Sequence, residues 1–193
     1  MQWVPRTLEM YIKEGPIRPD EALDIVIQIC SAIGHAHDQN TYHRDLKPSN
    51  IMLTKDNEPM VGDFGLSRAA DDNDKDLRGY YGGVEGTLAY IAPELFVAPD
   101  QTTPANPTGD IYALGIMLYE MIIGEHPIYP SEKPQTESQM IQLWQDAHQN
   151  MTPVFPAGRK IPDDLQSIIL TATHKQPENR FSSMSEMIET INS

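Results

Sequence analysis

The sequence has little cysteine and no long apolar run, and both absences exclude classes of protein. Cys30 is the only cysteine among 193 residues, so no disulfide can form within the chain and no zinc site built on cysteines is available. It lies in the largely apolar run 25–30, which predicts a buried, inert thiol. The longest apolar stretch, residues 111–119, is too short to span a bilayer. Residues 1–5 lack the charged start and apolar core of a signal peptide. We therefore expect a reduced, cytoplasmic setting and no membrane segment in this chain.

Basic residues are also scarce. The chain has 14 Lys and Arg against 28 Asp and Glu, which gives a formal net charge of −14 at pH 7. Contacts to phosphates need a basic surface, so the composition argues against nucleic acid as a partner and against docking on anionic lipid. It favours basic peptide substrates through electrostatic steering, although solubility alone explains the same balance.

The length suits one domain, and its apolar pattern is mainly helical. Residues 51–53 and 59–61 are short apolar runs separated by a polar turn, which predicts a small hairpin. The expected architecture is therefore mainly α with one small β element. Helices are expected over residues 7–14, 19–39, 110–123, 137–149, 163–173 and 183–192.

A long loop is expected from Asp63 to Glu94. Loops of this length inside a compact domain are normally functional. It contains the acidic run 71–76, which is explained by a solvated loop or, alternatively, by recruitment of basic partners.

The most informative stretch is Tyr-His-Arg-Asp-Leu-Lys-Pro-Ser-Asn at residues 42–50, followed thirteen residues after Asn50 by Asp63-Phe64-Gly65. This spacing suits phosphoryl transfer. Asp45 can orient a substrate hydroxyl and accept its proton, and Lys47 can neutralise a transferring phosphoryl group. Asn50 and Asp63 offer hard oxygen ligands for Mg²⁺.

These motifs resemble those of eukaryotic-type serine/threonine protein kinases, including bacterial ones. The resemblance implies that Asp45 is the base and that Arg44 belongs to the His-Arg-Asp triplet of the catalytic loop. It implies that Lys47, expected in Ser/Thr-directed kinases, contacts the γ-phosphate of ATP. Asn50 and Asp63 would hold Mg²⁺, with Asp63 bridging the β- and γ-phosphates.

The resemblance also places residues around the adenine and inside the lobe. Met52 would form the floor beneath the adenine, and the backbone of Gln2 and Val4 would face it. His43 and Phe64 would stack in the apolar column that links the two lobes of a kinase.

Downstream, Gly86–Glu94 resembles the substrate-docking segment of these kinases. Thr87 would hydrogen-bond Asp45 and Lys47, and Glu94 would pair with Arg180. Asp110 would anchor the backbone of the catalytic loop from a buried helix.

Some expected elements are absent from the sequence. It contains no Gly-rich loop, no strand lysine for the α- and β-phosphates and no helix glutamate to pair with that lysine. Residues 1–4 resemble the fifth strand and hinge, so residues 1–193 are expected to form the hinge and C-lobe of a partial kinase domain. The missing N-lobe of the same kinase is then an expected partner, and the isolated chain is expected to be inactive or nearly so.

The activation segment departs from the family as well. Gly83 stands at the usual phosphate-acceptor position, four residues before Thr87, so phosphorylation control of this loop is in doubt. Arg44 and Arg68 offer a basic pocket for a loop phosphate.

Two other functions fit parts of the sequence. The missing N-lobe favours a non-catalytic pseudokinase or scaffold. The evidence against that function is that all four expected catalytic and metal-binding residues are intact: Asp45, Lys47, Asn50 and Asp63. The second is a small-molecule phosphotransferase of related fold. The segment Gly86–Glu94 argues against it, because such enzymes generally lack this peptide-docking element.

The remaining histidines and aromatic residues have structural interpretations. His35 and His37 do not share a helix face for a metal, and Trp144 and Met140 are expected to pack. Surface positions are expected for His126, His148 and His174.

Overall fold

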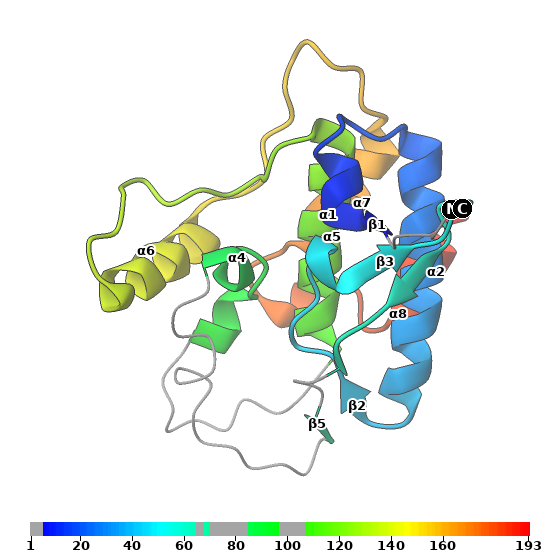
Figure 1. The fold of residues 1–193 in the computed structure, drawn as a ribbon, viewed down its shortest axis with the longest axis horizontal. Helices are drawn as coiled ribbons and strands as arrows, with labels where there is room; N and C mark the ends of the chain where they lie inside the picture. The colour runs from blue at the N-terminus through cyan, green and yellow to red at the C-terminus, as the bar shows by residue number, and fades with distance from the viewer. Residues whose placement is uncertain (1–5, 65–67, 70–84, 97–106) are drawn as a thin grey trace, which may run out of the picture.

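The computed structural model describes residues 6–64, 68–69, 85–96 and 107–193 of the chain. Its described part is mainly helical, as predicted, with small β elements beside the longest helix (Figure 1). The helices are α1 (Leu8–Ile12), α2 (Pro19–Asp38), α4 (Glu85–Leu88), α5 (Thr108–Ile123), α6 (Glu137–Asn150), α7 (Asp163–Ala172) and α8 (Met184–Ile191), with 3-10 helices at Pro48–Asn50, Pro93–Phe96 and Pro177–Asn179.

Helix α5 forms the centre of the core because it is apolar on every side. All but three of its sixteen residues are buried, and it packs against α2 and α7. The approach to α7 requires a glycine: a Cβ added at Gly115 would lie 2.7 Å from the Cβ of Ala172. The helix ends at Gly124, whose φ of 80° lies in the left-handed region that glycine adopts without strain. Helix α5 is thus a fixed frame from which side chains reach neighbouring segments.

The predicted hairpin is present, but it belongs to a larger β element. Strand β3 (Ile51–Leu53) pairs antiparallel with β4 (Pro59–Val61), and β1 (Arg6–Thr7) adds to the other edge of β3. Strands β2 (Thr41–Tyr42) and β5 (Arg68–Ala69) form a second sheet. The sequence analysis missed β1, β2 and β5 because two-residue strands are too short to show an alternating pattern.

Several helix boundaries follow local capping chemistry. The first expected helix begins one residue late, at Leu8, because the Thr7 side chain accepts a hydrogen bond from the backbone N–H of Met10 as its N-cap. Pro19 opens α2, with Asp20 and Glu21 in the first turn, where carboxylates are favourable. The region expected as one loop from Asp63 to Glu94 contains the short helix α4.

The core confirms some of the expected burial and corrects other expectations. Cys30 is fully buried, and its surroundings raise the pKa of the thiol to about 12. Trp144 is buried and packs with Met140, as predicted. His148 is not on the surface: it is fully buried, and both of its ring nitrogens find hydrogen-bond partners. His126 and His174, also expected at the surface, are only partly exposed, and the His126 ring packs against Tyr90 and Trp144.

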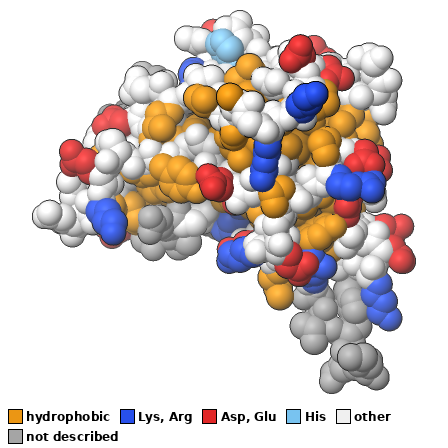
Figure 2. Space-filling view, turned by 90° about the horizontal axis from the view of Figure 1, so that it is seen from above, with side chains coloured by type: hydrophobic (Ala, Val, Ile, Leu, Met, Phe, Trp, Pro, Cys, Tyr) orange, Lys and Arg blue, Asp and Glu red, His pale blue; other side chains and the backbone are white. Residues whose placement is uncertain are grey.

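Apolar side chains also reach the surface, and Figure 2 shows groups of them among scattered charges on the face seen from above. Within the described residues, no helix combines the length and the hydropathy that a membrane crossing needs.

Candidate active site

The backbone of residues 42–50, the expected catalytic loop, is held by Asp110 of α5. Its Oδ1 accepts the backbone N–H of Arg44 at 2.8 Å, and its Oδ2 accepts that of His43 at 2.9 Å. The same Oδ2 lies 2.8 Å from Nε2 of His37 on α2. Arg44 has a φ of 64°, a conformation that costs a non-glycine residue free energy. Asp110, only 2% exposed, stabilises it by binding two successive N–H groups with one carboxylate, so the expected anchoring contact is present.

His43 connects the loop to the segment before Asp63. A carbonyl can only accept, so Nε2 of His43 donates to Gly62 O at 3.0 Å, while Nδ1 accepts the Asp45 backbone N–H at 3.3 Å. The His43 ring centroid lies 4.7 Å from that of Phe64, with the planes tilted by 56°. The predicted contact between the two rings therefore exists in tilted form.

Asp45, Lys47 and Thr87 form a linked polar group. The Lys47 ammonium lies 3.0 and 2.8 Å from the two Asp45 carboxylate oxygens, and it donates to the Thr87 hydroxyl at 2.8 Å. The expected contact between Thr87 and Lys47 is thus present, whereas Thr87 reaches Asp45 only through the ammonium. The carboxylate is 10% and the lysine side chain 18% exposed, so this ion pair is partly shielded from water.

Asn50 and Asp63 carry oxygen atoms that suit Mg²⁺. The backbone N–H of Gly62, the residue before Asp63, donates to the Asn50 carbonyl at 2.9 Å. The Asn50 amide nitrogen donates to the Asp45 carbonyl at 2.8 Å and to its Oδ2 at 3.1 Å, which leaves the amide oxygen as an acceptor. Asp63 is exposed, has a φ of 58° and makes no hydrogen bond to other described residues. Among the described residues, no group of three or more His, Cys, Asp and Glu could hold a metal. Two oxygen ligands nevertheless fit Mg²⁺, which keeps several waters and takes phosphate oxygens.

The adenine contacts are only partly within the described residues. Met52 is 37% exposed on β3 and lies opposite Met60 of β4. Gln2 and Val4 lie outside the described residues. So do the acidic run 71–76 and Gly83, and the side chain of Arg68 is likewise not described.

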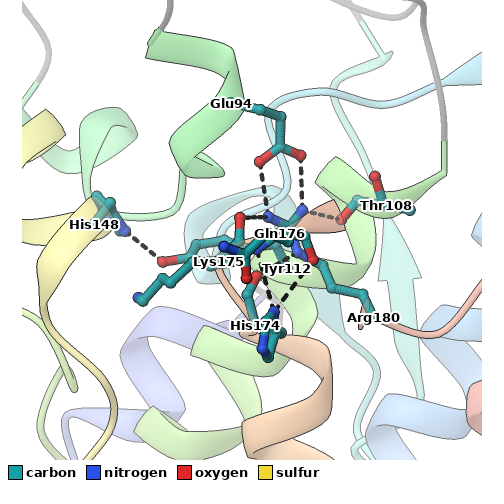
Figure 3. Close-up of polar contacts among 8 residues, drawn as sticks. All are labelled: Glu94, Thr108, Tyr112, His148, His174, Lys175, Gln176 and Arg180. Atoms are coloured by element: carbon teal, nitrogen blue, oxygen red, sulfur yellow. Dashed lines mark hydrogen bonds and ion pairs between the residues drawn. The ribbon is translucent and has the colours of Figure 1, made fainter. Parts of the chain in front are cut away.

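The expected ion pair between Glu94 and Arg180 is present and bidentate (Figure 3). Both N···O distances are 2.7 Å, and the Arg180 side chain is fully buried. The guanidinium also donates to the carbonyls of Thr108, His174 and Lys175, at 2.9, 2.7 and 3.2 Å. It lies 4.8 Å from the centroid of the Tyr112 ring, within range of a cation–π interaction. This pair ties the end of the docking segment, residues 86–94, to the connection between the 3-10 helix Pro177–Asn179 and α8.

Sequence reasoning missed further contacts to the docking segment. The Tyr90 hydroxyl donates to Glu120 on α5 at 2.6 Å, and burial raises the pKa of Glu120. His148 on α6 contacts Tyr112 and the Leu88 carbonyl. The available signal was polar and aromatic residues inside the apolar α5 pattern, which a buried helix tolerates only when they have partners.

Comparisons with known proteins identify the family of the chain. The sequence model of the protein kinase domain matches residues 2–190. The chain is 33% identical over 174 residues to the serine/threonine-protein kinase PknB of Mycolicibacterium smegmatis and 33% identical over 176 residues to that of Mycobacterium tuberculosis. It is 32% identical over 183 residues to the probable serine/threonine-protein kinase PknB of Corynebacterium glutamicum. These matches cover 90%, 90% and 93% of this chain.

The chain spans only about a quarter of the length of these relatives, 26%, 26% and 27% respectively. The match to the domain model, in contrast, extends over nearly every residue of the chain. The chain therefore belongs to the protein kinase family.

Proposed function

We propose that this chain is part of the catalytic domain of a protein kinase. The kinase would transfer the γ-phosphoryl group of ATP to Ser or Thr hydroxyls of proteins. The observation that carries the proposal is the linked group of Asp45, Lys47 and Thr87, in which an ammonium lies between a carboxylate and the docking segment. Lys47 and the names of the relatives support Ser/Thr as the acceptor. Because the chain covers a quarter of those relatives, the activity of the whole protein is part of the proposal.

Each residue has a proposed role set by its position. Asp45 orients the substrate hydroxyl and accepts its proton. Lys47 holds Asp45 and neutralises charge on the γ-phosphoryl group, and Arg44 supports the loop through its backbone. Thr87 fixes the Lys47 ammonium relative to the docked peptide. When bound, Mg²⁺ would neutralise phosphate charge, and Asn50 and Asp63 are the residues that would hold it.

The nucleotide and its surroundings complete the proposal. Met52 and the backbone of Gln2 and Val4 would contact adenine, and an N-lobe of the same kinase would cover the phosphates. We place the reaction in the cytoplasm, where ATP is available and where the free thiol of Cys30 remains reduced.

The test is transfer of labelled phosphate from ATP to a basic protein. Three proteins are compared: this chain, a version that includes any residues encoded in frame upstream, and that longer version carrying Asp45→Asn. We expect transfer by the longer wild type alone, with a loss of at least about a thousandfold for Asp45→Asn because the proton acceptor is removed. Asp24→Asn, at an exposed α2 position, is the matched control and should retain activity.

The other outcomes identify the alternatives. Absence of transfer by both wild-type forms would support a scaffold. Phosphorylation of an aminoglycoside or sugar with none of a protein would support a small-molecule phosphotransferase. Transfer by the short chain would remove the need for an N-lobe.

A further inference from the structure

We propose that His148 and Tyr112 are positioning residues that hold the docking segment, and through it Lys47, in the geometry for peptide phosphorylation. This inference rests on the proposed function and adds two residues to it. The contacts that carry it join α5, α6 and α4.

His148 is a fully buried histidine with both ring nitrogens in use. Its Nε2 donates to the Leu88 carbonyl at 3.0 Å, since a carbonyl only accepts. Its Nδ1 therefore accepts from the Tyr112 hydroxyl, at 2.7 Å. The ring stacks with both Trp144 and Phe96, at centroid distances of 5.6 and 5.7 Å. Burial lowers the pKa of His148 to about 3, with nearby His126 and Lys175 acting in the same direction. His148 is thus a neutral ring with one orientation and one tautomer.

Tyr112 holds His148 in place from the buried helix α5. It is fully buried on α5, its hydroxyl reaches His148, and its ring lies against the Arg180 guanidinium (Figure 3). Arg180 in turn binds Glu94. A single tyrosine therefore contacts two of the groups that bind the docking segment, His148 near its start and Arg180 at its end.

The contacts from Tyr112 through His148 extend to the linked group of Asp45, Lys47 and Thr87. Leu88, whose carbonyl His148 binds, follows Thr87 in α4. The Thr87 hydroxyl accepts from the Lys47 ammonium, which also binds Asp45. Thr87 and Leu88 share the single turn α4, and the backbone N–H groups of Tyr90 and Ile91 donate to their carbonyls at 3.2 and 3.4 Å. A shift of Leu88 should therefore displace Thr87 as well. Loss of the His148 contact should therefore misplace Lys47 relative to a docked peptide while leaving the nucleotide contacts intact.

The test compares Tyr112→Phe, His148→Leu and His148→Gln. Tyr112→Phe removes one hydroxyl and keeps the ring on Arg180. His148→Leu removes both hydrogen bonds, whereas His148→Gln retains a donor and an acceptor. The control is Tyr119→Phe, on the same helix, because the Tyr119 hydroxyl donates to Val154 O at 2.7 Å, away from the docking segment.

Two readouts separate positioning from folding. Hydrogen exchange of residues 86–96, measured by mass spectrometry on this chain, reports the anchor without requiring activity. Steady-state kinetics are measured with the same substitutions in whichever form of the protein transfers phosphate. They give kcat/KM for the peptide and KM for ATP. We expect both Tyr112→Phe and His148→Leu to speed local exchange. Tyr112→Phe should lower peptide kcat/KM by about tenfold, the effect of one buried hydrogen bond, and His148→Leu, which removes two, should lower it further. KM for ATP should stay within about twofold, and His148→Gln should recover part of the loss.

Several results would overturn the inference. One is equal acceleration of exchange throughout the chain, which indicates general destabilisation. Another is an equal effect of Tyr119→Phe, and a third is a parallel rise in KM for ATP. If no wild-type form transfers phosphate, the proposed function fails and the positioning role fails with it, while the exchange data still decide whether Tyr112 and His148 anchor residues 86–96.

Discussion

Asp110 binds the backbone N–H of Arg44 at 2.8 Å, and Arg44 has a left-handed φ of 64°. The catalytic loop thus keeps a strained backbone at the residue before Asp45 because a buried carboxylate on another element stabilises it.

Asp110→Asn should lower the free energy of unfolding by about 2–3 kcal/mol, since an amide offers one acceptor where the carboxylate accepts three hydrogen bonds. Urea unfolding measures the change. The matched substitution Asp24→Asn is exposed and should change stability by less than about 0.5 kcal/mol. Equal effects of the two variants would contradict the assigned role of Asp110.

Glu94→Gln should destabilise by about 3 kcal/mol, because it leaves the fully buried Arg180 guanidinium without a charged partner. The comparison is Glu9→Gln, which breaks the exposed pair between Glu9 and Lys13 on α1 and should cost less than about 0.5 kcal/mol. Thermal unfolding of both variants tests the difference, and a similar shift in both would argue against a special role for the buried pair.

Stability should fall as the pH falls below about 6.5. The folded pKa of His148 is lowered to about 3 and that of His126 to about 4, both by burial, from an ordinary value of 6.5. Between these values the unfolded chain binds more protons than the folded chain. The free energy of unfolding therefore decreases by about 1.4 kcal/mol per pH unit for each histidine.

Urea unfolding from pH 7.5 to 4.5 measures this slope. His148→Gln should make it shallower, whereas His35→Gln, at an exposed position, should leave it unchanged. A slope for His148→Gln equal to that of the wild type would show that His148 does not titrate as described.

Thr87→Val should lower phosphoryl transfer to peptide by about tenfold, because it removes the hydroxyl that accepts from Lys47 but keeps the shape. Thr87→Ser should retain most activity. The control Thr173→Val removes a buried hydroxyl bound to Ile169 O, and it should affect stability without changing kcat/KM. Loss of activity in Thr87→Ser equal to that in Thr87→Val would show that the methyl group matters more than the hydrogen bond.

Gly115→Ala should cost about 1–3 kcal/mol, since the added methyl group would lie 2.7 Å from Ala172 Cβ and 2.8 Å from Thr173 Cγ2. Gly158→Ala meets no atom within 4 Å and should be neutral. Thermal unfolding distinguishes the two, and a neutral Gly115→Ala would mean that α5 and α7 separate without cost.

Long periodic segments made the helices predictable from the sequence. Helices α2, α5, α6, α7 and α8 lie within about two residues of their expected bounds, because apolar spacing and capping residues determine them locally. The contacts of Asp110 and of Glu94 with Arg180 were also expected, but from resemblance, since partners 67 and 86 residues apart leave no local pattern.

The buried His148 shows where sequence reasoning failed. On a mostly polar helix a histidine is ordinarily a surface residue. Its burial depends on Tyr112 and on the Leu88 carbonyl, 36 and 60 residues away. Short strands β2 and β5 were missed for a related reason, because their pairing and not their composition defines them.

The attachment of the catalytic loop to Asp110 has a consequence for synthesis on the ribosome. Residues 43 and 44 emerge well before residue 110, 66 and 67 positions later. At about 5–20 residues per second, the loop must wait several seconds for the carboxylate that stabilises it. Until then nothing stabilises the left-handed backbone of Arg44, so the nascent loop samples other conformations. The conformation seen at residues 43 and 44 is established only when α5 docks.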